Sequence, residues 1–285
     1  DLGAYENVLA ESPYPKQVKN VTATIGSQSI SLSWDANTET DLDKYVIYAS
    51  MVKDFTPTRE DSVGETTATV YNVTGLTNNT EYHFRVAAVN TSGYRGTFSQ
   101  ELSAIPKYKG PVWWVDSGNG NDQNDGSQLS PFQSLSWAFT AMSNGDTIKM
   151  APGPHGPGSD AMRPQDEGLT ELTIIGDSEN ARDIEFNAMN STPHFVLNNI
   201  KVTFRNITFL NGYNGSAGGS INTSHAELII ENCIFENNSS LQGAGAIRAY
   251  MTPIIIKNSI FKDNFSKYNG GAIQIDTDDG STNIE

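Results

Sequence analysis

One motif recurs three times in the C-terminal part of this 285-residue chain. It reads FLNGYNGSAGGSI from Phe209, FENNSSLQGAGAI from Phe235 and FKDNFSKYNGGAI from Phe261, so both intervals are 26 residues. A fixed period of about 20 to 50 residues is typical of stacked units, each too small to bury its apolar face alone. The repeat therefore predicts a solenoid over this part of the chain.

Each repeat follows a short β-branched run, and no segment within it has the length or periodicity of a helix. The runs are VTFRNITF, LIIENCIF and IIIKNSIF. They favour a parallel β-helix, in which each turn places its strands about 4.8 Å from those of the previous turn. Equivalent side chains then form ladders along the axis. The expected ladders are Phe209/Phe235/Phe261, Ile221/Ile247/Ile273, Asn206/Asn232/Asn258, Gly212/Asn238/Asn264, Gly219/Gly245/Gly271 and, pointing outward, Asn222/Arg248/Gln274.

The residue types in these ladders predict structural roles. We expect the phenylalanines to fill the core and the asparagines to satisfy the backbone of the turns. The paired glycines would give tight or left-handed corners that a Cβ atom would obstruct. Cys233 shares a small-residue position with Ile207 and Ser259, so we expect a buried, unreactive thiol. A functional site is therefore expected among the residues that do not repeat.

The repeats resemble those of known bacterial proteins. FENN and FKDN, followed by AGAI and GGAI, resemble the repeats of polymorphic outer membrane proteins of the chlamydial type and of related right-handed β-helix proteins. Upstream, VWWVDSGNGNDQNDGSQLSPFQSLSWAFTAMSNGDTIKMAPG from Val112 resembles the first segment of pectate-lyase-like right-handed β-helices. That resemblance implies a strand, an Asp/Asn/Gly loop, a capping helix and a first coil. Leu135, Ala138, Phe139 and Met142 have helical spacing, as a helix that closes the end of the core would require.

The N-terminal part shows a different pattern, that of an antiparallel sandwich. SISLSW alternates Ile30, Leu32 and Trp34 with serines, and DKYVIYAS and TEYHFRVAAVN add two further strands between turn signals. The segment resembles a fibronectin type III domain. The residues that carry this resemblance are Pro15 and Val18, Trp34, Asp41-Leu42-Asp43, Gly75-Leu76, Tyr82, VAAVN and Gly93. It implies that Trp34 lies in the core and that the Tyr82 hydroxyl binds upstream backbone.

These patterns together predict an all-β chain. It would contain a fibronectin-III-like β-sandwich and a right-handed parallel β-helix with an N-terminal capping helix. We place a linker or the tail of a preceding module at residues 1–11 and the sandwich at 12–107. The first strand and the cap of the β-helix follow at 108–145, and 26-residue coils, cut short at the C-terminus, at 146–285. DLGAYEN at residues 1–7 resembles the closing stretch of another such β-helix.

Composition limits the classes of function. The chain has 18 Lys and Arg against 33 Asp and Glu, a formal net charge of −15. This excludes a general nucleic-acid binder, which needs a basic surface, and no stretch has the roughly 20 apolar residues of a membrane span. The single cysteine excludes an internal disulfide. Abundant Asn, Thr, Ser and Gly without disulfides is typical of exported bacterial proteins, so we expect an extracellular or cell-surface location.

One acidic loop has the ligand chemistry of a calcium site. Carboxylate and amide oxygens are the groups that Ca²⁺ prefers, and the candidate ligands are Asp116, Asn121, Asp122, Asn124 and Asp125. The loop lacks the fixed spacing and terminal Glu of an EF-hand. The competing interpretation is a loop of Asx-turns whose side chains bind its own backbone. A second acidic cluster, DTDDG at 276–280, is read as a corner loop or a weak cation site.

A polar loop at 155–168 is the best candidate for contact with a sugar. The candidate ligand-binding residues are His155, Asp160, Arg163, Asp166 and Glu167 in this loop, together with Arg248 on the outer ladder. The competing interpretation is a solvated insertion that protrudes from one corner. No two histidines have the spacing of metal ligands.

We interpret the chain as a non-catalytic structural or adhesion segment of a larger surface or secreted bacterial protein. Glycans, surface proteins or other copies of the chain would be its partners, with no nucleic acid. The alternative is a polysaccharide lyase or glycoside hydrolase of the β-helix type that depends on Ca²⁺, which would need clustered carboxylates on an exposed face. A third hypothesis is pure architecture, such as a filament or surface-layer subunit.

Overall fold

The computed structural model describes residues 13–156, 160–276 and 283–284. The motif at residues 1–7 and most of the acidic cluster at 276–280 lie outside these ranges. The chain divides into two compact units, Asp1–Tyr108 and Lys109–Glu285, and both are built mainly of strands. The all-β prediction is confirmed.

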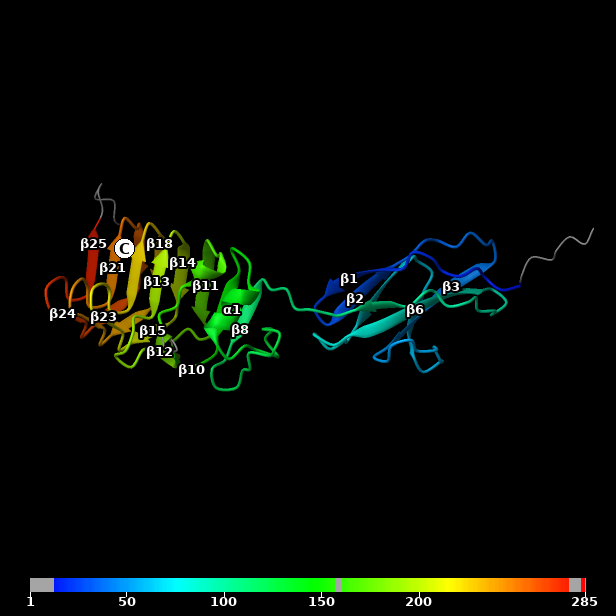
Figure 1. The fold of residues 1–285 in the computed structure, drawn as a ribbon, viewed down its shortest axis with the longest axis horizontal. Helices are drawn as coiled ribbons and strands as arrows, with labels where there is room; N and C mark the ends of the chain where they lie inside the picture. Colours follow the sequence, from blue (N-terminus) through cyan, green and yellow to red (C-terminus); the bar gives the residue numbers. More distant parts are fainter. Residues whose placement is uncertain (1–12, 157–159, 277–282, 285) are drawn as a thin grey trace, which may run out of the picture. The chain divides into compact units, whose positions relative to one another are not determined.

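The first unit is a sandwich of two antiparallel sheets (Figure 1). Its core joins the inward faces of both sheets, as the alternation in the sequence predicts. Ile30, Leu32 and Trp34 are buried, and the Trp34 ring packs edge-on against Tyr45 at 5.3 Å between centroids. The three-stranded sheet has the order β1 (Thr22–Gly26), β2 (Ser29–Ser33), β5 (Val70–Thr74); the other has the order β4 (Ser62–Thr66), β3 (Leu42–Ser50), β6 (Tyr82–Asn90), β7 (Leu102–Ala104).

Tyr82 makes the predicted tyrosine corner. Its hydroxyl accepts a hydrogen bond from the backbone N–H of Thr77 at 3.1 Å. This bond ties the start of β6 to the turn that precedes it, which is the structural role that such a corner has in sandwiches of this class.

The second unit is a parallel β-solenoid (Figure 1). Successive turns stack from β8 toward β25, so that each sheet collects one strand from each turn. The seven-stranded sheet has the order β26 (Asn283–Ile284), β22 (Ile254–Lys257), β18 (Glu227–Glu231), β14 (Lys201–Arg205), β11 (Glu171–Gly176), β9 (Thr147–Met150), β8 (Val112–Val115). A second sheet has the order β10 (Gly153–His155), β12 (Ile184–Asn187), β15 (Thr208–Leu210), β19 (Ile234–Glu236), β23 (Ile260–Lys262). A third has the order β13 (Phe195–Asn198), β17 (Ile221–Ser224), β21 (Ile247–Tyr250), β25 (Ile273–Asp276). A short fourth sheet has the order β16 (Tyr213–Asn214), β20 (Ser239–Ser240), β24 (Phe265–Ser266).

The register of these strands follows the 26-residue repeat. Phe209 pairs with Phe235 and Phe235 with Phe261, and the stacked rings lie 4.7 and 4.8 Å apart between centroids. Cys233 is fully buried, and this burial raises the pKa of its thiol to about 12. The aromatic ladder and the buried thiol are confirmed.

A second ladder, of asparagine side chains, lies inside the solenoid. The Asn238 amide is completely buried; it accepts from the backbone N–H of Gly212 at 2.8 Å and donates to the carbonyl of Phe209 at 3.1 Å. Asn264 repeats the second bond one turn later, to the carbonyl of Phe235 at 2.9 Å. Each amide thus satisfies backbone groups that the corner would otherwise leave unpaired, because buried polar groups without partners are costly.

Left-handed corners are supplied mainly by asparagine, so the prediction of tight or left-handed corners at the paired glycines is wrong in its left-handed part. Positive φ angles occur in three columns with the 26-residue period; the columns are Asn199/His225/Met251, Asn206/Asn232/Asn258 and Asn211/Asn237/Asp263. Asparagine and aspartate tolerate this region better than other residues that carry a Cβ. Along the middle column, the Asn232 amide also donates to the Asn206 oxygen at 2.7 Å.

The predicted obstruction of a Cβ atom at the paired glycines is confirmed, because the backbone of neighbouring turns approaches them closely. A Cβ atom at Gly219 would overlap backbone atoms of Gly245 and Ser239, whereas one at Gly215 would meet nothing within 4 Å. We therefore expect Gly219→Ala to destabilise the solenoid by about 1–3 kcal/mol, the usual cost of overpacking. Gly215→Ala is the matched control, and thermal unfolding of both variants is the measurement. Equal melting temperatures for the two would contradict this account.

A short helix closes the N-terminal end of the solenoid core. In α1 (Leu135–Ala141), Leu135, Ala138 and Phe139 are buried, and the helix lies beside β8 (Figure 1). Ser134 caps it, with its hydroxyl accepting from the N–H of Trp137 at 3.4 Å. The predicted capping helix is confirmed.

Candidate ligand-binding face of the solenoid

The sheet β13–β17–β21–β25 brings the polar loop and the outer ladder to one side of the solenoid. Met162 forms a parallel bridge with Phe195, and its N–H donates to the carbonyl of His194 at 2.9 Å. The 3-10 helix η1 (Pro164–Glu167) follows, and Gln165 donates to the carbonyl of Val196 at 3.0 Å. The loop therefore continues this sheet by one rung, and the expectation of a simple protruding insertion is wrong for this part of it.

Two polar columns run side by side along the outer surface of this sheet. We call this surface the polar face and define it by Val196, Asn222, Arg248 and Gln274 in one column and Asn198, Ser224, Tyr250 and Asp276 in the other. The strand spacing of about 4.8 Å repeats hydrogen-bonding groups at regular intervals. The second column was not predicted, because its four residue types differ. In the sequence, this column is marked only by its 26-residue spacing, because each of its residues lies two positions after a residue of the first column.

The contacts within the polar face hold its side chains in place. Arg248 forms an ion pair with Asp276 at 3.3 Å, and Gln274 donates to the same carboxylate at 3.0 Å. Tyr250 remains 41% exposed, with the His225 ring edge-on at 5.7 Å between centroids. Amide, guanidinium and carboxylate groups beside an exposed aromatic ring are able to bind sugar hydroxyls and a sugar ring together.

The predicted loop residues differ in their access to solvent. Four of the predicted residues are exposed, namely Asp160, Arg163, Asp166 and Glu167. Because Met162 forms a parallel bridge with Phe195, the next residue, Arg163, is aligned with Val196. Arg163 thus stands at the head of the column that contains Arg248. These residues stay predicted ligand contacts.

His155 is buried and is only 3% exposed, so its predicted contact with a sugar needs correction. Its Nδ1 lies 2.7 Å from the Ser117 hydroxyl and its Nε2 lies 2.7 Å from the carbonyl of Ala151. Burial lowers the pKa of His155, although the Ala151 carbonyl and nearby Asp116 act in the opposite direction. The imidazole therefore joins β10 to the preceding loop.

Side chains of the acidic loop bind backbone groups within the loop and just before α1. Asp116 accepts from the N–H groups of Gly118 and Asn119, both at 2.9 Å. Partial burial raises the pKa of Asp116, but these hydrogen bonds outweigh it and hold the pKa below its usual value. Asp122 accepts from the N–H of Ser134 at 2.8 Å and so fixes the start of α1.

The remaining candidate calcium ligands also bind backbone groups, Asn124 through its amide nitrogen. Asn121 accepts from the N–H of Gln123, Asn124 donates to the carbonyl of Pro131, and Asp125 accepts from the N–H of Ser127. Within the part of the chain that the structure describes, no group of three or more His, Cys, Asp or Glu residues is arranged to hold a metal ion. Calcium binding stays a prediction.

Comparison with known proteins identifies the first unit. Residues 15–105 match the family model of the fibronectin type III domain, so the chain contains such a domain followed by a parallel β-solenoid. No curated protein matches the chain. Among the residues described, no helix has the length and hydropathy needed to cross a membrane.

Three similar solved structures each cover about a third of the chain. The FN1–FN3 domains of chicken CNTN1 share 24% identity over 32% of this chain and 32% of theirs, with a TM-score of 0.29. An Fn3-like protein from Clostridium thermocellum shares 25% identity over 33% of this chain and 93% of its own, with a TM-score of 0.28. Chitinase ChiA74 from Bacillus thuringiensis shares 26% identity over 32% of this chain and 13% of its own, with a TM-score of 0.27.

Proposed function

We propose that this chain is a non-catalytic adhesion and spacer segment of a secreted or surface-displayed bacterial protein. The fibronectin type III domain and the solenoid would supply length, and the polar face would bind glycans. The two columns of Asn, Ser, Tyr, Arg, Gln and Asp on one sheet, with Tyr250 exposed, are the observation that carries this proposal. Fibronectin type III domains are common structural and binding modules, which agrees with it.

The paired side chains of the polar face favour binding over cleavage. Asp276 is neutralised by Arg248, whereas cleavage of a glycosidic bond by acid–base chemistry uses two carboxyl groups on either side of the bond. The rigid stack of parallel strands holds the binding groups in fixed positions. A ligand therefore loses little free energy to reorganisation of the protein.

Binding of the purified chain to immobilised glycans tests the proposal. We expect Arg248→Ala/Tyr250→Ala to weaken binding at least tenfold, because the change removes both an aromatic contact and a charged donor. Arg205→Ala/Phe265→Ala is the matched control, since it removes one exposed cation and one exposed ring from two other sheets. Equal affinity for both double variants would contradict the assignment of the polar face.

Self-association is a second candidate function. Phe265 and Tyr268 are 61% and 65% exposed, and exposed large apolar side chains favour contact with another copy. A sedimentation coefficient that rises with protein concentration would support this candidate, and a constant monomer value would contradict it.

A further inference from the structure

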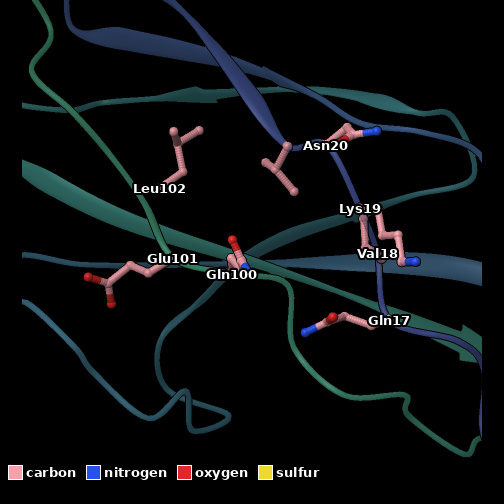
Figure 2. A pocket seen from close by; sticks show the side chains of 8 residues that line it. Gln17, Val18, Lys19, Asn20, Gln100, Glu101 and Leu102 are labelled. Atoms are coloured by element: carbon pink, nitrogen blue, oxygen red, sulfur yellow. The ribbon is translucent and has the colours of Figure 1, made fainter.

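A second candidate site lies in the fibronectin type III domain, along two segments that are distant in the sequence. Residues 17–21 and 100–102 line a hollow of about 480 Å³ (Figure 2). Residues 14–17 and 95–98 line an adjoining hollow of about 660 Å³, and Gln17 belongs to both. Its amide donates to the carbonyl of Phe98 at 2.6 Å and so joins the two segments. We call the two hollows together the edge groove.

The edge groove carries positive charge in a chain whose net charge is −15. Lys16, Lys19 and Arg95 line it, and all three are exposed. The Glu39 carboxylate lies beside Lys16 and accepts from its backbone N–H, and the charge of Lys16 helps to lower the pKa of Glu39. The Arg95 guanidinium lies 4.3 Å from the centre of the Phe98 ring and donates to the Tyr48 hydroxyl at 3.3 Å. These contacts orient Arg95 without neutralising its charge.

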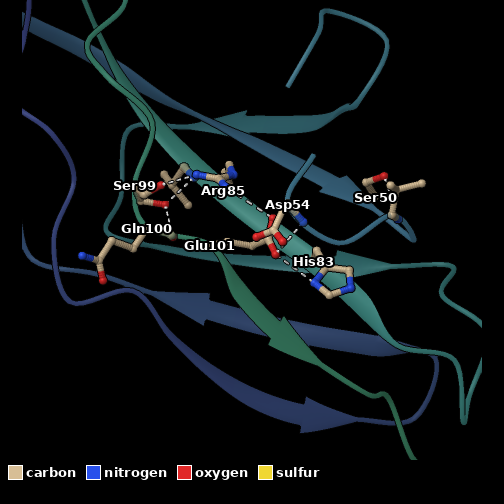
Figure 3. A network of polar contacts seen from close by, with 9 residues as sticks. Ser50, Asp54, His83, Arg85, Ser99, Gln100 and Glu101 are labelled. Carbon is tan, nitrogen blue, oxygen red and sulfur yellow. Dashed lines mark hydrogen bonds and ion pairs between the residues drawn. The ribbon is translucent and has the colours of Figure 1, made fainter. Parts of the chain in front are cut away.

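Glu101 is the one acidic residue among the described residues that line the groove, and its carboxylate is turned away. Figure 3 shows it pointing toward His83 and Arg85; its Oε1 lies 3.1 Å from the His83 Nδ1, and it forms an ion pair with Arg85 at 3.4 Å. It also accepts from the N–H of Asp54 at 3.0 Å. Burial raises the pKa of Glu101, but these partners outweigh it and lower the pKa overall. The negative charge of Glu101 is therefore balanced by Arg85 and by the Asp54 N–H outside the groove. The other charged side chains that line the groove are cationic.

We infer that the edge groove binds an acidic polysaccharide, that is, a linear glycan with carboxylates on its sugars. Two adjoining hollows suit an extended ligand, and the three cations are complementary to a regular series of negative charges. The amides of Gln17 and Gln100 are able to bind sugar hydroxyls. This inference uses a different unit from the polar face and does not depend on it.

The test is binding of the full chain to soluble polygalacturonate in buffer with EDTA, so that calcium does not bridge the two. We expect binding that weakens as salt is added and that falls at least tenfold in Lys16→Gln/Arg95→Gln. Lys53→Gln/Arg59→Gln removes two exposed cations elsewhere in the same domain and should leave the affinity unchanged. The loss caused by Lys16→Gln/Arg95→Gln should be equally large in a chain that also carries Arg248→Ala/Tyr250→Ala, which separates this site from the polar face.

Two comparisons complete the experiment. Dextran is the neutral glycan and polyglutamate the acidic peptide chain, and both should bind at least tenfold more weakly than polygalacturonate. If loss of the Arg95–Phe98 contact unfolds the domain, binding is measured in Lys19→Gln, because Lys19 is exposed and its replacement should leave the fold intact. The inference is overturned if polygalacturonate does not bind, if polyglutamate binds equally well, or if the groove variants bind as the wild type does.

Discussion

Replacing Phe235 with alanine is expected to destabilise the solenoid by about 3–5 kcal/mol, the usual cost of removing a buried aromatic side chain. Phe235 is fully buried and stacks on Phe209 and Phe261 on its two sides. Its removal would leave a cavity in the middle of a ladder whose strands are fixed by hydrogen bonds on both edges. The surrounding turns therefore have little freedom to collapse into the space.

Hydrogen exchange of the solenoid strands in increasing denaturant would measure this effect separately from the fibronectin type III domain. Phe265→Ala is the control, because that ring is 61% exposed and exposed positions usually change stability by less than about 0.5 kcal/mol. Similar losses in the two variants would mean that the aromatic ladder is not the core of the solenoid.

Acidification from pH 7 to pH 4 is expected to cost the solenoid about 3 kcal/mol through His194 alone. This imidazole is completely buried between Phe186 and Phe209, with Nε2 2.6 Å from the carbonyl of Phe186 and Nδ1 2.9 Å from the Ser220 hydroxyl. Burial lowers its pKa from 6.5 to about 4, against smaller opposing effects of the Phe186 and Leu210 carbonyls. Each pH unit of such a difference corresponds to about 1.4 kcal/mol.

The sign follows from proton binding. Between pH 6.5 and about 4 the unfolded chain binds a proton at this histidine and the folded chain does not, so unfolding is favoured as the pH falls. The stability that depends on a neutral His194 is fully present above pH 6.5 and is lost progressively as the pH falls from 6.5 to about 4. Acidic side chains with lowered pKa values, such as Asp116 and Glu236, add a further loss at lower pH.

Variants at two histidines isolate this effect. In His194→Gln, the difference in solenoid stability between pH 7 and pH 4.5 should shrink by about 2 kcal/mol relative to the wild type. His225 is exposed and has a positive φ angle, so His225→Asn is the control and should keep the wild-type pH dependence. An unchanged pH dependence in His194→Gln would show that His194 does not titrate in this way.

The spacing of the repeat was enough to predict the register of the solenoid. Phe209, Phe235 and Phe261 are separated by a constant interval, and each turn must present the same face to the core. Alternation in SISLSW was enough to place Ile30 and Leu32 in the sandwich core for the same reason. Both patterns are local or periodic, and the energetic cause is burial of apolar area.

Features that depend on the close approach of backbone segments distant in the sequence were harder to predict. The sequence predicted tight or left-handed corners at the paired glycines; the structure confirms the close approach at Gly219 but places asparagine at most of the left-handed positions. The edge groove joins Gln17 to Phe98 across 81 residues of sequence, and no local pattern encodes that contact. Tyr250 was not predicted as a binding residue, because the four residues of its column differ in type and each is common on exposed surfaces.

The most direct test of the proposed function is incubation of the chain with a panel of polysaccharides, with and without Ca²⁺. Both bound protein and newly formed chain ends would be measured. We predict binding to at least one glycan with no new chain ends in either condition. New chain ends that appear only with Ca²⁺ would contradict a non-catalytic role and point to the acidic loop around Asp116 and Asp122.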